Sequence, residues 1–170
     1  MKTIVLTLIL LTGAVFAGFA QKTQKAILSV GIDAGVIVGS ISDKANMAIG
    51  GSVKYDLPVC AKSFVTLSAG YSYLIYTNDY KVNLTGFQAS QTGGEGYVPL
   101  KAGFKYLFCD YFYGEGQVGA SIPTQGGGVG FAYAPGVGVK LSAVDFGVRY
   151  EAWSNTNTIS QVALRLAYGF

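Results

Sequence analysis

The last ten residues, QVALRLAYGF at positions 161 to 170, alternate strictly between two kinds of side chain. One parity holds small and polar residues together with Arg165. Successive side chains of a β-strand point to opposite faces, so this segment is predicted to be a strand with one apolar face. A chain end that is not tied into a sheet usually frays, and so strict a pattern indicates that this strand is tied in. The apolar parity comprises Val162, Leu164, Leu166, Tyr168 and Phe170.

The same period of two continues backward through the chain as far as Lys25, with no stretch of helical period. Each alternating segment has one apolar face without charge and one face of small residues that carries the charges. Three of the segments have two or more charges, and in all three the charges share one parity. The eight predicted strands are residues 26–38, 47–57, 64–76, 97–108, 111–122, 129–141, 144–153 and 159–170.

The connections between these segments alternate in length. Three are short, at residues 58–63, 109–110 and 142–143, and the others are longer or more polar. Short turns at one end, longer loops at the other and an even number of strands are typical of an outer-membrane β-barrel. Strands of about 9 to 13 residues also suit a tilted crossing of a bilayer. The longer connections are residues 40–46, 77–96, 123–128 and 154–158.

The size of the side chains indicates which face is inside. Eight strands enclose an interior that is just wide enough for side chains to fill. The apolar face carries bulky residues at nearly every position, whereas the other face carries mainly glycine, serine and alanine with a few long ions. We therefore predict an all-β fold, an eight-stranded antiparallel up-and-down transmembrane β-barrel with its apolar face outward. Because open strand edges have no partners in lipid, the last strand must close on the first. The alternative is a soluble periplasmic barrel that encloses an apolar ligand.

The first twenty residues are predicted to be a secretory signal peptide. Lys2 precedes an apolar run over residues 4–11, and small residues lead to a cleavage site between Ala20 and Gln21. An uncleaved anchor is the alternative, but the apolar run is short for a spanning helix. The predicted organisation is a signal peptide at 1–20 and one barrel domain at 21–170.

Composition separates the chain from ordinary soluble proteins and from nucleic-acid-binding proteins. Charged residues make up only 12% of the chain, while there are 24 Gly, 12 Tyr and 10 Phe. The 12 basic and 9 acidic residues are scattered without a basic run. We therefore expect no nucleic-acid partner.

Three segments resemble the outer-membrane β-barrel domain family, the small porin-fold barrels of the eight-stranded OmpA and OmpX type. They are GYVPLKAGFKYLF at 96–108, APGVGVKLSAVDFGVRYE at 134–151 and the last ten residues. The resemblance covers roughly residues 21–170 and implies a place in the bacterial outer membrane, in contact with lipid and lipopolysaccharide. It also implies that the barrel-assembly machinery and periplasmic chaperones act on the chain, and that the apolar residues of the final strand are the assembly signal. Pro135 departs from the pattern and predicts a bulge or bend.

The inward face is predicted to contain six cations and five anions, near enough to balance for mutual pairing. We predict a network in the middle of the barrel that plugs the lumen. Two alternatives are that these ions merely fill space, and that they gate a narrow pore. The predicted network comprises Asp33, Lys101, Glu115, Arg149, Glu151 and Arg165.

No catalytic, cofactor or metal site is predicted. The chain has no histidine, and the outer-membrane barrel enzymes that it resembles in fold all need one. Cys60 and Cys109 lack CxxC spacing and are predicted to lie at the periplasmic end, either as a disulfide or as two free thiols. The expected role is therefore non-enzymatic, structural or a binding role of the surface loops, with residues 77–96 as the best candidate loop and no partner named.

Overall fold

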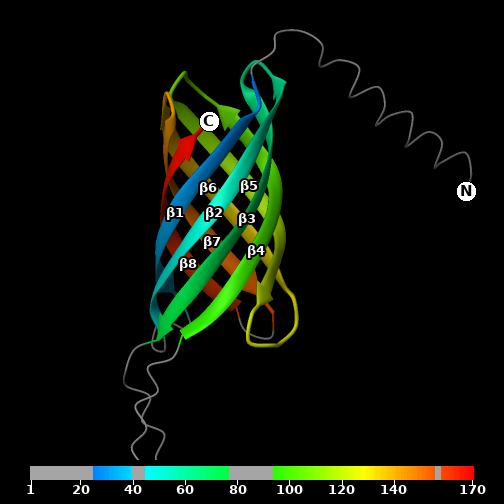
Figure 1. The fold of residues 1–170 in the computed structure, drawn as a ribbon, viewed down its shortest axis with the longest axis vertical. Coiled ribbons are helices and arrows are strands. Elements are labelled where there is room, and N and C mark those ends of the chain that lie inside the picture. Colours follow the sequence, from blue (N-terminus) through cyan, green and yellow to red (C-terminus); the bar gives the residue numbers. More distant parts are fainter. Residues whose placement is uncertain (1–24, 40–44, 77–93, 156–157) are drawn as a thin grey trace, which may run out of the picture.

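The chain forms a closed barrel of eight strands (Figure 1). The computed structural model describes residues 25–39, 45–76, 94–155 and 158–170. The prediction of an eight-stranded antiparallel barrel is confirmed, and all eight observed strands begin and end within three residues of the predicted bounds. The strands are β1 (Ile27–Val38), β2 (Ala45–Cys60), β3 (Ser63–Tyr76), β4 (Gly94–Leu107), β5 (Phe112–Pro123), β6 (Gly130–Leu141), β7 (Val144–Ser154) and β8 (Thr158–Gly169).

Each strand pairs with its sequence neighbour, and β8 closes the barrel on β1. The closing ladder runs without a break from Ser29 opposite Gly169 to Val38 opposite Ser160. The backbone N–H of Phe170, the last residue, also donates to the Leu28 carbonyl oxygen at 2.8 Å. The final segment is therefore half of the closing seam, which explains why its alternation continues to the end of the chain.

The wall has its apolar side outward and its charged side inward. Leu164 is 48% exposed and Ile32 67% exposed, whereas Arg165 is 3% exposed and Lys105 only 1%. Soluble proteins show the opposite tendency, because charged side chains are almost never fully buried there unless they are paired. The predicted direction of the two faces is confirmed.

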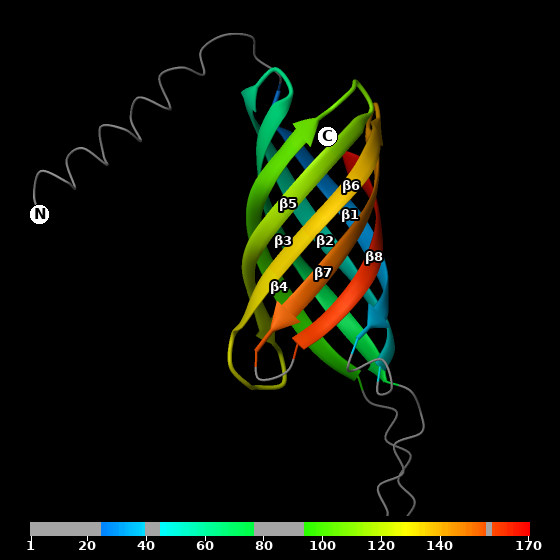
Figure 2. The same ribbon diagram turned by 180° about the vertical axis from the view of Figure 1, so that it is seen from behind.

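Short and long connections lie at opposite ends of the barrel. The two-residue turns at 61–62 and 142–143 and the turn at 108–111 all lie at the end where the chain terminates (Figure 1). In the view from behind, the described connection between β5 and β6 lies at the other end, together with the strand ends that border the other longer connections (Figure 2). We call these the short-turn end and the long-loop end.

Of the bulge or bend predicted at Pro135, the bulge is not formed. The register between β6 and β7 is the same on both sides of the proline, with Tyr133 opposite Ala152 and Gly136 opposite Arg149. The ladder lacks only the positions between these two pairs, so the missing N–H interrupts pairing locally without inserting a residue. Register shifts occur instead near the two ends of β2.

Glycine on the inward face allows neighbouring strands to lie close together. A Cβ added at Gly119 would clash with the carbonyl oxygen of Leu100 on β4, and one at Gly103 would clash with that of Gly116 on β5. The small inward residues are therefore required by the wall itself as well as by the narrow lumen.

The predicted signal peptide, with its cleavage between Ala20 and Gln21, lies outside the described residues. Among the residues that the structure describes, no helix is long and apolar enough to cross a membrane.

Candidate functional site

The lumen holds almost all of the polar chemistry of the described chain, arranged in three layers along the barrel axis. An apolar plug lies near the long-loop end, a mouth cluster of ions lies near the short-turn end, and a mid-barrel cluster of ions lies between them. The mid-barrel cluster comprises Asp33, Lys101, Arg149, Glu151 and Arg165, and the mouth cluster comprises Lys54, Asp56, Lys105, Glu115 and Asp145.

Glu151 is the centre of the mid-barrel cluster. Its Oε1 accepts from Lys101 Nζ at 2.5 Å and from the indole Nε1 of Trp153 at 2.9 Å. Its Oε2 lies 3.0 Å from Arg149 Nε. Glu151 is 1% exposed and Lys101 6% exposed, so this carboxylate neutralises one cation that water barely reaches and a second, Arg149, whose side chain is 14% exposed.

Asp33 links the two arginines of the same cluster. Its Oδ1 lies 3.0 Å from Arg149 Nη2 and 3.9 Å from Arg165 Nε. Its Oδ2 accepts from Ser52 Oγ at 2.6 Å, and Arg165 donates to Ser52 Oγ at 3.2 Å and to Ser29 Oγ at 3.3 Å. Ser29 on β1 and Ser52 on β2 therefore accept hydrogen bonds from Arg165, because the Asp33 carboxylate is too far from its guanidinium to accept them.

Lys105 is the centre of the mouth cluster. Its Nζ lies 2.9 Å from Asp145 Oδ2 and 3.2 Å from Asp56 Oδ2. The same ammonium sits 3.9 Å from the ring centroid of Tyr113, a cation–π contact. The Tyr113 hydroxyl in turn donates to Asp145 Oδ1 at 2.5 Å. Lys105 is thus held by two carboxylates and one aromatic face.

Glu115 does not lie in the mid-barrel cluster, although the sequence analysis grouped it there. It pairs instead with Lys54 Nζ at 2.7 Å, and Lys54 also lies 4.0 Å from Asp145. The other five residues of the predicted network do come together. The alternation along a strand predicts which side chains point into the lumen. It does not predict which of these ions form pairs across the barrel.

The apolar plug is a feature that the sequence analysis missed. Large side chains turn inward near the long-loop end, where only small residues and ions were expected. Leu74 is 1% exposed, and the rings of Tyr97 and Trp153 stack with their centroids 4.9 Å apart. Inward parity could have indicated these residues. The plug comprises Ile37, Ala45, Ala48, Leu74, Tyr97, Ala132 and Trp153.

Little space remains between the ion clusters. Cavities of about 20 Å³ and 10 Å³ flank Arg149, and a single water molecule needs roughly 10–15 Å³ on the same scale. Among the described residues, no group of three or more histidine, cysteine or acidic side chains is placed to hold a metal ion. These two cavities have room for isolated waters but for no organic ligand.

The two cysteines are free, and both are exposed. Cys60 ends β2 and Cys109 lies in the turn between β4 and β5, both at the short-turn end. The disulfide that the sequence analysis kept as one alternative is therefore not formed.

The sequence matches no protein-family model, and it matches none of the curated proteins. The structure of Ail, the attachment invasion locus protein of Yersinia pestis, solved with the heparin analogue sucrose octasulfate, superposes with a TM-score of 0.61 over 86% of this chain and 100% of Ail, at 18% identity. This is the fold of the small outer-membrane β-barrels.

Two further small barrels show the same fold. The outer membrane enzyme PagL matches with a TM-score of 0.57 over 82% of this chain and 98% of its own, at 15% identity. A de novo designed transmembrane barrel matches with a TM-score of 0.55 over 88% of this chain and 100% of its own, at 12% identity. An attachment protein, an enzyme and a designed protein share this small barrel fold, so the fold by itself assigns no activity.

Proposed function

We propose that the protein is an integral barrel of the bacterial outer membrane, non-enzymatic and non-conducting, which holds its longer loops at the cell surface for a structural or binding role. The observation that supports this most is the continuous apolar outer wall. A water-exposed apolar surface of this extent would be an association and aggregation hazard in a soluble protein. In a bilayer, lipid tails surround this apolar wall. Barrel closure also pairs the strand edges, which would have no hydrogen-bond partners in lipid.

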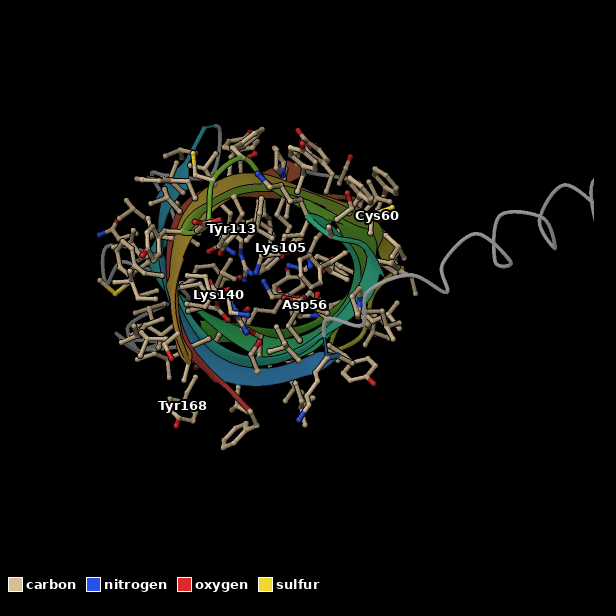
Figure 3. All side chains as sticks on the ribbon, turned by 90° about the horizontal axis from the view of Figure 1, so that it is seen from above. Asp56, Cys60, Lys105, Tyr113, Lys140 and Tyr168 are labelled. Atoms are coloured by element: carbon tan, nitrogen blue, oxygen red, sulfur yellow. The ribbon has the colours of Figure 1, made fainter. Side chains whose placement is uncertain are left out.

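Aromatic side chains on the outer wall support the same placement. Transmembrane barrels carry aromatic girdles at both membrane interfaces. Tyr168 points away from the barrel at the short-turn end (Figure 3), with its ring centroid 5.0 Å from that of Phe170. Exposed rings also gather near the long-loop end of the wall. Those of the short-turn end are Phe104, Tyr106, Phe108, Tyr111, Phe112, Phe146, Tyr168 and Phe170, and those of the long-loop end are Tyr71, Tyr73 and Phe131.

The partners follow from that placement. The outer wall would contact membrane lipid and lipopolysaccharide, and the barrel-assembly machinery and periplasmic chaperones would act during insertion. Short turns face the periplasm in barrels of this kind, so the long-loop end would face outward. The longest connection there, residues 77–93, is our candidate for a surface partner and lies outside the described residues.

The filled lumen supports a non-conducting barrel. Two layers of ion pairs and the apolar plug occupy it, and wide aqueous channels need about 16 strands. A non-enzymatic role is supported by the absence of histidine from the whole chain, which leaves no imidazole to activate a serine or a water molecule.

The location is tested by expression with the native N-terminus. In outer-membrane fractions the unboiled protein should resist SDS and migrate differently from the boiled protein on a gel. Removing Phe170, whose backbone N–H donates the last hydrogen bond of the seam to the Leu28 carbonyl oxygen, should deplete the folded form, while removing the exposed Lys62 side chain (Lys62→Ala) should not. Recovery of the protein in the soluble periplasmic fraction without a shift would contradict the proposal.

Conductance distinguishes the sealed barrel from the gated pore. We expect purified wild-type protein to give no discrete current steps in planar bilayers in which a 16-stranded porin does conduct. Steps that appear in the wild type and change when Arg149 or Arg165 is replaced by glutamine would instead favour the pore. Lys62→Gln, which removes a charge from the exposed turn at 61–62, is the control for a general charge effect.

A further inference from the structure

Between the apolar plug and the short-turn end, the ions of the lumen are balanced in one cluster and unbalanced in the other. Lys140 lies within the ring of strands at the mouth (Figure 3) and opposite Asp145 in the β6–β7 ladder. With Lys140, the mouth cluster has three cations and three anions. The mid-barrel cluster has one positive charge too many. Its cations are Lys101, Arg149 and Arg165, and its anions are Asp33 and Glu151.

Arg165 is the least compensated cation of the mid-barrel cluster. Its nearest carboxylate oxygen, Asp33 Oδ1, is 3.9 Å from Nε and is shared with Arg149, from which it lies only 3.0 Å away. No other carboxylate of the described residues forms an ion pair with Arg165. The side chain is 3% exposed, and a buried charge without a close partner is strongly destabilising.

One nitrogen of the Arg165 guanidinium has no hydrogen-bond partner. Nε donates to Ser52 Oγ at 3.2 Å and Nη2 donates to Ser29 Oγ at 3.3 Å. These two nitrogens form one edge of the planar group, so Nη1 is directed away from the serines. Nη1 is buried and finds no partner among the described residues. Arg149 Nε also makes no hydrogen bond, but it lies 3.0 Å from a Glu151 oxygen.

A small cavity of about 20 Å³ lies against this guanidinium. Arg165, Arg149 and Lys54 line it, together with Tyr113, which points into the ring of strands (Figure 3). Glu115 is the one carboxylate among the lining residues, and it is already paired with Lys54 at 2.7 Å. The cavity exceeds the roughly 10–15 Å³ that one water molecule needs. It therefore offers room for one monatomic ion in a positively charged setting.

We propose that this cavity binds a single halide ion, chloride under physiological conditions, which completes the charge of the mid-barrel cluster. The ion accepts a hydrogen bond from Arg165 Nη1, and Arg149 adds positive charge in the same cavity. Hydrogen bonds to a charged acceptor are about twice as strong as neutral ones. A water molecule would satisfy Nη1 but would leave the surplus charge. The positive lining excludes a cation, and the small volume excludes organic anions.

The experiment measures how chloride changes the stability of the protein folded in phospholipid vesicles. Chloride replaces gluconate stepwise at constant ionic strength, so that screening stays the same, and gluconate is too large for the cavity. Urea unfolding followed by Trp153 fluorescence gives the unfolding equilibrium constant at each step. Because the folded state alone holds the ion, this constant should fall about tenfold for each tenfold rise in chloride above the dissociation constant. The same titration applies in buffer if the barrel proves soluble.

Two substitutions remove the surplus charge in opposite ways. Arg165→Gln removes a cation, whereas Ser29→Asp adds a carboxylate beside Arg165 without changing the residues that line the cavity. The chloride dependence should disappear in both variants. Lys62→Gln removes a charge from the exposed turn at 61–62 and should keep the wild-type dependence. Unchanged heat-modifiability on a gel shows that the barrel of each variant is intact.

Crystals of the wild type grown in bromide locate the ion directly. We expect an anomalous difference peak inside the barrel, beside Arg165 Nη1. This measurement decides the question even if neither variant folds.

Three results would overturn the inference. An unfolding constant that does not depend on chloride in the wild type would show that water, or loss of a proton from Lys101, resolves the surplus charge. A dependence that survives Arg165→Gln or Ser29→Asp would place the ion elsewhere. Bromide peaks confined to the outside of the barrel would indicate an adventitious ion only. None of these results bears on the location of the barrel.

Discussion

Replacing Glu151 with glutamine should lower the free energy of unfolding by about 3–5 kcal/mol, the range for breaking a buried ion pair by removing one partner. Glutamine has nearly the same shape and can still accept the hydrogen bond of Trp153. It cannot neutralise Lys101 and Arg149, both of which contact the Glu151 carboxylate at 3.0 Å or less. The variant therefore leaves the three cations of the mid-barrel cluster with a single anion, Asp33, which pairs with Arg149 and Arg165.

Urea titration in phospholipid vesicles measures this loss. Trp153 is the only tryptophan of the chain and donates to Glu151, so its fluorescence reports unfolding. Glu95→Gln is the matched control, because Glu95 is a half-buried carboxylate that pairs with no cation among the described residues and accepts from the Tyr76 hydroxyl at 3.1 Å. We expect it to cost about 1 kcal/mol. Equal small losses in the two variants would show that the mid-barrel cluster contributes little to stability.

Replacing Leu164 with arginine should lower the free energy of unfolding in the same vesicles by about 2–4 kcal/mol. Leu164 lies halfway along β8 with its side chain on the outer wall, 48% exposed. In a bilayer that exposure is to hydrocarbon, where a guanidinium loses its hydration. On the surface of a soluble protein the same substitution usually changes stability by no more than about 0.5 kcal/mol.

The depth dependence of the effect provides the control. Val144 is also on the outer wall, 42% exposed, but it begins β7 at the short-turn end. Val144→Arg should therefore cost only about 0–1 kcal/mol, as arginine does near the membrane interface. Losses of about 0.5 kcal/mol or less at both positions would contradict membrane insertion and would favour the soluble barrel.

The fold could be predicted because the pattern that indicates each strand lies within that strand. The alternation of side chains along a strand is a property of each strand by itself, so residues 161–170 indicate a strand and its two faces without knowledge of any partner. The number of strands and the alternating lengths of the connections then leave closure as the solution that pairs every edge. Pro135 shows the limit of the same reasoning, because the ladder with β7 continues in one register past the proline.

The lumen could be predicted in composition but not in arrangement. Parity placed Glu115 inside the barrel, yet its partner is Lys54 on β2, a strand that is not its neighbour in the sheet. Which ions meet across the lumen depends on strand tilt and on side-chain length, and neither is visible in a single strand. The inward turn of Tyr97 and Trp153 follows parity, but their stacking depends on how β4 and β7 face each other across the barrel.

The sequence by itself determined that the chain has eight strands, that the apolar face is distinct from the charged face, and that the last strand takes part in closure. These follow from period, side-chain volume and the need to pair every backbone group. Only the tertiary structure decided that the ions separate into two clusters and that aromatic side chains close the lumen at the long-loop end. The physical reason is that these contacts join side chains from strands on opposite sides of the barrel, and their distances exist only once the sheet has closed.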